Sequence, residues 1–153
     1  MLRISKTTWA ALVLLLGTAW LLPACSDEAG SADGGPNALV VGFSQIGAES
    51  DWRKANTDSI QSEATKRGID LRFSDAQQKQ ENQIKAIRSF IAQGVDVIAF
   101  SPVVETGWEP VLREAKQAGI PVVLSDRLVD VSDESLYASF IGSDFIAEGR
   151  NAA

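Results

Sequence analysis

Polar and aromatic side chains follow the ends of two short apolar runs, and their types suit the recognition of a neutral sugar. Trp52 and Arg53 come shortly after the apolar run LVVGF, and Asp126 and Arg127 come directly after IPVVLS. A carboxylate accepts hydrogen bonds from vicinal hydroxyls, a guanidinium donates to them, and an indole covers the apolar C–H face of the ring. If the two segments meet, one ligand can receive both kinds of contact.

Each of these residues also has a structural interpretation that involves no ligand. Trp52 would be the first core residue of an amphipathic helix, and Asp126 would only cap its strand end or pair with Arg127. Trp108 stands just before EPVLREA, where we favour a side chain that fixes a helix to the sheet over a ligand contact. Three glutamines fit a solvated approach to a helix at least as well as a binding surface: Gln77, Gln78 and Gln80.

The composition excludes several classes of function. The 153 residues contain no histidine, which removes the Ser-His-Asp and Cys-His arrangements and the commonest metal ligand. One cysteine, Cys25, can form neither an intrachain disulfide nor a cysteine-based zinc site, and a net charge of −6 argues against nucleic acid. The segment GFSQIG has the glycine spacing of a phosphate-binding loop, but Ala48 and Glu49 stand where Lys and Ser or Thr are required. We therefore expect no enzyme, no metal site and no cofactor.

An amino-terminal leader is predicted at residues 1–24. Arg3 and Lys6 precede the apolar run WAALVLLLGTAWLLPA, which is shorter than the ~20 residues that a membrane-spanning helix needs. This layout is typical of a secretory signal peptide, and a retained membrane anchor is the alternative. The segment LLPAC also resembles the bacterial lipobox, which implies that Cys25 is lipidated and becomes the mature amino terminus. Residues 25–38 are predicted to be a flexible linker, because the residues that follow Cys25 have no apolar periodicity.

The candidate site residues are positioned by a repeated alternation of strand and helix. Apolar runs rich in β-branched residues predict buried strands, and the segments between them have helical periodicity. In the second helix, the apolar face contains Ile84, Ile87, Phe90 and Ile91. The expected strands cover residues 38–44, 69–74, 95–101, 120–125 and 136–142, and the expected helices cover residues 52–67, 79–93 and 108–118, with a new helix beginning after residue 142.

Glycines mark the helix ends and fix the order of the repeat. Gly68, Gly94 and Gly119 are spaced 26 and 25 residues apart, and each can take the left-handed conformation that ends a helix before the next strand. Ser50 or Asp51 is the expected cap at the start of the first helix. Right-handed crossovers then predict an α/β fold, a parallel sheet with helices on both faces. In such a sheet a ligand lies beyond the carboxyl ends of the strands, where the candidate residues are.

Four segments stand in the chain in this order: VGFSQIGAESDWR, QQKQENQIKAIRSFIAQGVD, SPVVETGWEPVLREAKQAGIPV and SDR, of which the first three are long. They resemble, in the same order, segments of the periplasmic sugar-binding proteins of ABC importers, of the ribose- and galactose-binding type. The likeness runs from about Leu39 to the end. The resemblance implies a two-lobe fold of type I. Residues 39–142 would be its amino-terminal α/β lobe, and residues 143–153 would begin the crossover to a second lobe that is absent from this sequence. A cut fragment, an incomplete gene and a genuine single-lobe protein are three explanations that the sequence leaves open. Half a cleft is expected to bind sugar weakly or not at all.

The same resemblance implies the site, the ligand and the partner. The implied ligand is a galactofuranose- or galactose-like monosaccharide that is passed to an ABC permease of the inner membrane. The protein would be exported to the periplasm or cell envelope and tethered through Cys25. A sugar sensor that presents the ligand to a chemoreceptor or sensor kinase is the alternative. The implied ligand-binding residues are Glu49, Ser50, Asp51, Trp52 and Arg53 in the first loop, with Asp126 and Arg127 opposite. Asp51 departs from the small residue usual at its position.

Overall fold

The computed structural model describes residues 38–153, and the predicted signal peptide, Cys25 and all but the last residue of the predicted linker lie outside this range. Strands and helices alternate along the described chain, as the sequence pattern predicts. In chain order the elements are β1 (Val40–Gln45), α1 (Asp51–Lys66), β2 (Asp70–Asp75), α2 (Gln80–Gln93), β3 (Val97–Phe100), α3 (Glu109–Gln117), β4 (Val122–Ser125), the 3-10 helix η1 (Glu134–Leu136), β5 (Ser139–Ile141) and α4 (Phe145–Ala152).

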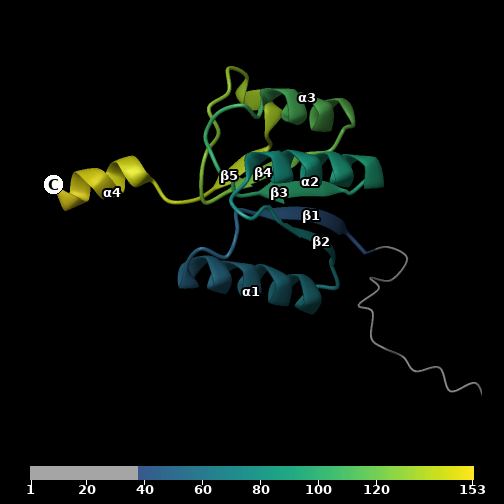
Figure 1. Cartoon of the computed structure of the whole chain (residues 1–153), viewed down its shortest axis with the longest axis horizontal. Helices are drawn as coiled ribbons and strands as arrows, with labels where there is room; N and C mark the ends of the chain where they lie inside the picture. Colours follow the sequence, from purple (N-terminus) through teal and green to yellow (C-terminus); the bar gives the residue numbers. More distant parts are fainter. Residues whose placement is uncertain (1–37) are drawn as a thin grey trace, which may run out of the picture. The chain divides into compact units, whose positions relative to one another are not determined.

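The five strands form one parallel sheet in the order β2-β1-β3-β4-β5. Figure 1 shows α1 on one face of this sheet and α2 and α3 on the other, which confirms the predicted α/β class with helices on both faces. The chain adds β2 on one side of β1 and β3 on the other. The sheet therefore reverses its direction of growth beside β1, which is where ligands bind in open α/β sheets.

Local sequence signals mark the start of α1 and the ends of three helices where expected. Ser50, one of the two predicted caps, accepts a hydrogen bond at its side chain from the Arg53 N–H, at 3.1 Å. Gly68, Gly94 and Gly119 have φ angles of 64°, 65° and 73°, which confirms their predicted left-handed conformation. Because glycine has no Cβ, it takes this conformation without the steric cost that other residues meet.

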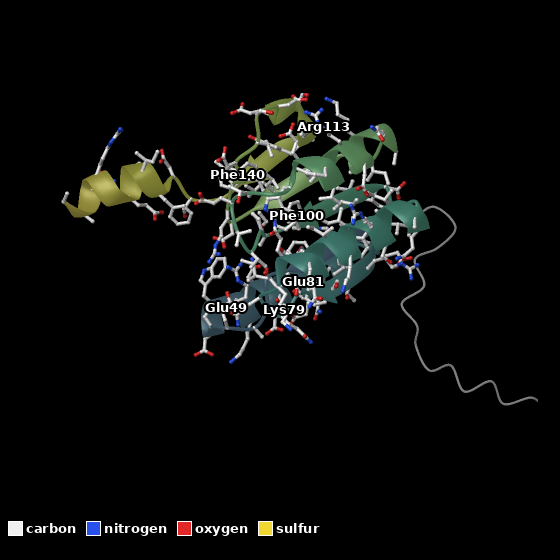
Figure 2. The ribbon with its side chains drawn as sticks, turned by 45° about the horizontal axis from the view of Figure 1, so that its top comes forward. Glu49, Lys79, Glu81, Phe100, Arg113 and Phe140 are labelled. Atoms are coloured by element: carbon white, nitrogen blue, oxygen red, sulfur yellow. The ribbon has the colours of Figure 1, made fainter. Side chains whose placement is uncertain are left out.

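The core lies mainly between the sheet and the α2 and α3 layer. Ile87 and Phe90 of α2 are buried as predicted, and Trp108 is fully buried with its ring centroid 4.9 Å from that of Phe100. The Trp108 Nε1–H donates to the Val104 carbonyl at 2.7 Å, so the packing interpretation of Trp108 is confirmed. Figure 2 shows Phe100 in this interior, while Arg113 points outward from α3.

The strand predicted over residues 136–142 is shorter than expected. The Asp133 side chain accepts from the Ser135 N–H at 3.0 Å and starts a 3-10 turn, and the turn carries Leu136 into the core at 3% exposure. Pairing with β4 therefore covers only Ser139–Ile141. Within residues 38–153, no helix combines the length and apolar character needed to cross a membrane.

Candidate functional site

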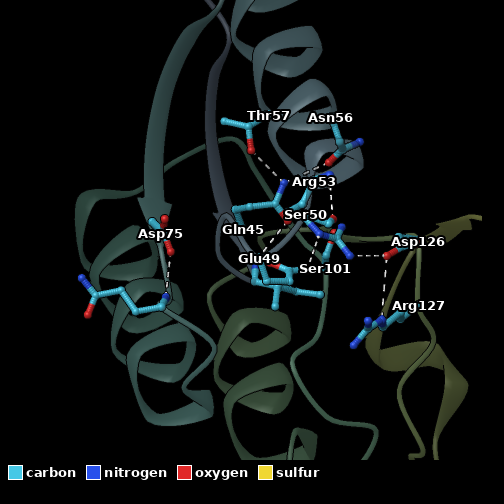
Figure 3. A network of polar contacts seen from close by, with 12 residues as sticks. Gln45, Glu49, Ser50, Arg53, Asn56, Thr57, Asp75, Ser101, Asp126 and Arg127 are labelled. Carbon is cyan, nitrogen blue, oxygen red and sulfur yellow. Dashed lines mark hydrogen bonds and ion pairs between the residues drawn. The ribbon is translucent and has the colours of Figure 1, made fainter.

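The segments that follow β1 and β4 meet beyond the carboxyl edge of the sheet. Arg53, in the first turn of α1, donates from Nη2 to the Asp126 carboxylate at 2.8 Å, across 73 residues of sequence. Strand β3 lies between β1 and β4 in the sheet, so the two segments face each other above its end. Figure 3 shows Arg53 reaching from α1 towards Asp126, with Arg127 beside it. The sequence-predicted residues are thus brought together from two distant parts of the chain.

Arg53 is the centre of this cluster. It is 3% exposed, and besides its bond to Asp126 it donates from Nε to Glu49 at 3.1 Å. Its third nitrogen, Nη1, is buried and has no hydrogen-bond partner among the described residues. A buried guanidinium donor is costly to leave unpaired, because its hydration is lost without replacement. Arg53 therefore keeps one donor that no described residue satisfies.

Trp52 faces solvent, and the interpretation of it as a core residue is wrong. Trp52 is 57% exposed, and it is the second residue of α1. The Arg53 guanidinium carbon lies 4.7 Å from the centroid of the indole, within the range of a cation–π contact. The contact holds an exposed apolar ring beside the buried donor.

Ser50 and Asp51 serve the start of the helix. The Ser50 hydroxyl is occupied by the Arg53 N–H, and the Asp51 carboxylate is fully exposed and pairs with Lys54 at 3.1 Å. Neither side chain bonds to the side chains of Arg53 or Asp126 in this structure. They lie at the rim of the cluster formed by the other predicted residues.

Asp126 has a backbone conformation that aims its carboxylate at Arg53. Its φ is 68°, unusual for a residue with a side chain, and its N–H donates to the Ile141 carbonyl at 2.8 Å. The carboxylate lies 3.8 Å from the Arg127 Nε, a longer contact than the 2.8 Å to Arg53. Local pairing with Arg127 is therefore the weaker of its two interactions.

The cluster carries balanced charge. Glu49 and Asp126 supply two negative charges, and Arg53 and Arg127 supply two positive ones. Partial burial would by itself raise the pKa of Glu49, but a backbone hydrogen bond, the Arg53 guanidinium and the nearby charge of Arg127 outweigh it and hold the pKa below its ordinary value. Glu49 is therefore ionised near neutral pH, and a neutral polar ligand leaves the balance undisturbed. No group of metal-binding side chains occurs in residues 38–153.

Two buried glutamines make hydrogen bonds near the end of β1, and neither was identified from the sequence. Gln45, fully buried at the end of β1, donates from Nε2 to Asn56 at 2.9 Å and to Thr57 at 3.1 Å, which ties α1 to the strand (Figure 3). Gln83 is fully buried on α2. Its signal was present in the sequence, because Gln83 lies four residues before Ile87 and so falls on the apolar face of its helix.

A hollow of about 1050 Å³ borders the polar cluster at Arg127. It is lined largely by apolar residues, including Val104 and Leu128 in the segments after β3 and β4, Phe140 of β5 and Phe145 at the start of α4. Arg127 is in its lining, whereas Trp52, Arg53 and Asp126 are not. Because the lining lacks their donors and acceptors, we place the site at the polar cluster and not in this hollow.

Comparisons with known proteins agree on one family. The model of the periplasmic binding protein domain matches residues 41–153. The galactofuranose-binding protein of Escherichia coli is 63% identical over 112 residues, which cover 73% of this chain and 35% of that protein. The fructose import binding protein of Bifidobacterium longum is 35% identical, over 95% of this chain and 46% of that protein.

A solved structure with the same fold has a furanose bound. The periplasmic binding protein component of the arabinose ABC transporter from Shewanella sp. ANA-3, bound to α- and β-L-arabinofuranose, is 64% identical with a TM-score of 0.71, over 72% of this chain and 37% of that one. The chain therefore spans between about a third and a half of the length of the relatives it matches. The described residues correspond to one lobe of the type I fold.

Proposed function

This chain belongs to the family of periplasmic binding protein domains, and from that premise we propose that it is the sugar-binding lobe of an exported protein that captures a galactofuranose-like sugar and delivers it to an ABC importer. The ligands of two relatives support a furanose: galactofuranose for the Escherichia coli protein and arabinofuranose for the Shewanella one. These relatives are binding proteins and not enzymes.

One observation carries the proposal: Arg53 is buried, is held by two carboxylates, and keeps Nη1 unpaired beside the exposed ring of Trp52. In our proposal Nη1 donates to a sugar oxygen and the indole covers the C–H face of the ring. Asp126 and Glu49 accept from hydroxyls with their remaining lone pairs, since a carboxylate accepts several hydrogen bonds at once. Arg127 adds a donor from the opposite segment.

The two rim residues have smaller roles in this proposal. Ser50 acts through its cap, which fixes the backbone at Arg53, and Asp51 contributes only a charge at the entrance. The sensor alternative uses the same site and differs only in the protein that receives the sugar. It has less support, because the Shewanella relative is a transporter component.

A sugar titration that is monitored by NMR tests the proposal. The full chain is titrated with methyl β-D-galactofuranoside and with methyl β-D-galactopyranoside, because glycosides keep their ring form. We expect the furanoside to shift the Trp52 indole N–H and Arg53 guanidinium signals in a saturable way. The Arg53→Met variant should lose the response, while Arg72→Met, at an exposed arginine in β2, should keep it. A wild-type chain that responds to neither sugar would contradict the proposal.

We further propose that the protein is tethered to the envelope through Cys25. The family supports export to the periplasm, and the lipobox resemblance of LLPAC supports the tether. In cells supplied with labelled palmitate, the wild-type chain should be labelled and Cys25→Ala should not. Equal labelling of the two chains would remove the tether from the proposal.

A further inference from the structure

Gln83 is a polar residue on the core side of α2. It is fully buried, and it occupies the same helix face as Ile87 and Phe90, which pack in the core. Burial of a carboxamide is unfavourable unless its donors and acceptor find partners. An apolar side chain of similar volume would fill the position at no such cost, so the hydrogen bonds that Gln83 makes identify its role.

The carboxamide of Gln83 joins three points of the backbone. Its Nε2 donates to the Ser101 carbonyl at 2.7 Å and, more weakly, to the Ser44 carbonyl at 3.4 Å. Its Oε1 accepts from the Val103 N–H at 2.9 Å. One side chain therefore links the end of β1 with the first residues after β3.

These points lie where the sheet reverses its direction of growth. β1 pairs with β2 on one side and with β3 on the other, so the crevice of this sheet opens above the carboxyl ends of β1 and β3. The Ser101 N–H donates to the Ser44 carbonyl at 3.3 Å, which is the last backbone bond between the two strand ends. The Gln83 side chain also donates to the Ser44 carbonyl, and its bonds to Ser101 and Val103 extend the link between the strand ends into the segment after β3.

The backbone groups that bind Gln83 lie close in the chain to both halves of the site cluster. Ser44 is followed by the last residue of β1, by the loop that contains Glu49, and by the first turn of α1, which contains Arg53. On the other side, the segment after Val103 accepts a hydrogen bond at the Glu105 carbonyl from the Asp130 N–H, at 2.7 Å. Asp130 belongs to the segment that begins with Asp126.

We propose that Gln83 is a positioning residue for the sugar site, which fixes the segment after β3 (residues 101–107) against the end of β1 and so sets the separation between Arg53 and Asp126. The effect on sugar affinity rests on the proposed function, whereas the effect on segment 101–107 does not. Gln83 makes its hydrogen bonds to backbone atoms of Ser44, Ser101 and Val103 and not to the proposed ligand-binding residues, so it acts through the backbone.

Hydrogen exchange of backbone amides in the full chain, without sugar, tests the structural half. The Gln83→Met variant keeps the volume and removes the three bonds. We expect exchange at the Val103 amide to be about tenfold or more faster than in the wild type, as expected for a lost buried hydrogen bond. The matched control is Ile87→Ala, at an equally buried residue one turn further along α2. It should destabilise the whole lobe without selectively exposing Val103.

The sugar titration described above tests the functional half. Gln83→Met should weaken binding of methyl β-D-galactofuranoside about tenfold, and Ile87→Ala should leave the affinity of the folded fraction unchanged. If Gln83→Met does not fold, Gln83→Asn replaces it, because asparagine keeps the polar group but is too short to reach Val103 from the helix.

The outcomes separate this inference from the proposed function. Protection of Val103 that is unchanged in both Gln83 variants would overturn the inference, as would an equal loss of affinity in Ile87→Ala. A wild-type chain that binds no furanose would contradict the proposed function, and the exchange at Val103 would still decide whether Gln83 fixes the segment.

Discussion

Neighbouring residues Trp52 and Arg53 have opposite environments, and helix geometry explains the difference. Consecutive residues of an α-helix point about 100° apart, so the face that buries Arg53 against Glu49 and Asp126 turns Trp52 towards solvent. Trp52 is 57% exposed and Arg53 is 3% exposed. In the proposed site, the buried arginine supplies a hydrogen-bond donor of fixed direction and the exposed indole supplies apolar area for the C–H face of the sugar.

The exposure of Trp52 leads to a prediction that separates binding from stability. Trp52→Ala should change the free energy of unfolding by less than about 0.5 kcal/mol, because an exposed side chain contributes little to the core. It should weaken furanoside binding about tenfold, through the loss of the apolar contact with the ring. Chemical denaturation and the NMR titration measure the two quantities.

Leu39→Ala is the matched control, since Leu39 is 47% exposed just before β1, at the amino end of the sheet. It should affect neither quantity. If Trp52→Ala lowers stability by several times the effect of Leu39→Ala and leaves affinity intact, Trp52 is a structural residue and not a sugar contact.

At the scale of the elements, α2 packs closely on β1 because β1 contains a glycine. A Cβ placed on Gly42 would lie 2.5 Å from the Cγ of Phe90, which is closer than real side chains approach. The close packing of α2 on β1 also places Gln83 within reach of Ser44 and Ser101. Gly42 thus contributes to the position of the site, although it lies at the middle of a strand.

Gly42→Ala is therefore expected to be destabilising. The methyl group must displace the Phe90 ring, which should cost about 1–3 kcal/mol, as for other overpacked cores. Thermal and chemical unfolding measure this loss. Gly149→Ala lies in exposed α4, and apart from its chain neighbours and its own helix backbone nothing lies within 4 Å of the added Cβ. This substitution should be neutral or stabilising.

A second variant tests the cause of the loss. Combining Gly42→Ala with Phe90→Leu removes the clash, so the double variant should be less destabilised than the sum of the two single ones. Strict additivity would show that Phe90 is not the group that the new methyl displaces.

At the scale of the whole molecule, the described carboxylates with a perturbed pKa are all shifted downwards. Hydrogen bonds from a side chain are the largest cause for four of them: Lys66 for Glu63, Arg113 for Glu109, Arg88 for Glu114, and Ser135 for Asp133. Glu49 has a lowered pKa as well, because its hydrogen bonds outweigh its burial. The sequence contains no histidine, so no side chain has an ordinary pKa between pH 5 and 8.

These shifts predict how stability depends on pH. A carboxyl whose pKa is lower in the folded state than its ordinary value, 4.5 for glutamate and 3.8 for aspartate, stabilises the fold above that value. The contribution is lost as the pH falls through the folded-state pKa. We therefore expect the melting temperature to be nearly constant from about pH 6 to 8 and to fall progressively below about pH 4.5.

Thermal unfolding followed by circular dichroism measures this dependence. Glu114→Gln removes the carboxylate that Arg88 binds, so the variant should lose less stability on acidification than the wild type. A melting temperature that rises between about pH 4.5 and 3 would be inconsistent with the direction of these pKa shifts.

Local sequence patterns are sufficient to predict the alternation of strands and helices, the parallel α/β class and the ends of the helices. These features depend on short-range patterns: apolar runs, a serine cap at Ser50, and glycines such as Gly94 that end a helix at a positive φ. The long motifs also indicated the family. The last strand was predicted too long, because the buried 3-10 turn at Leu136 depends on the core it enters.

Which candidate residues meet, and which way they face, depends on the packing of the elements against one another. The Arg53 and Asp126 contact joins residues 73 positions apart, and it exists because strand order places β1 and β4 on either side of β3. The exposure of Trp52 and the three backbone bonds of Gln83 likewise depend on how α1 and α2 lie against the sheet. Local sequence specifies the elements, but their lateral order and the direction of each side chain follow from long-range packing.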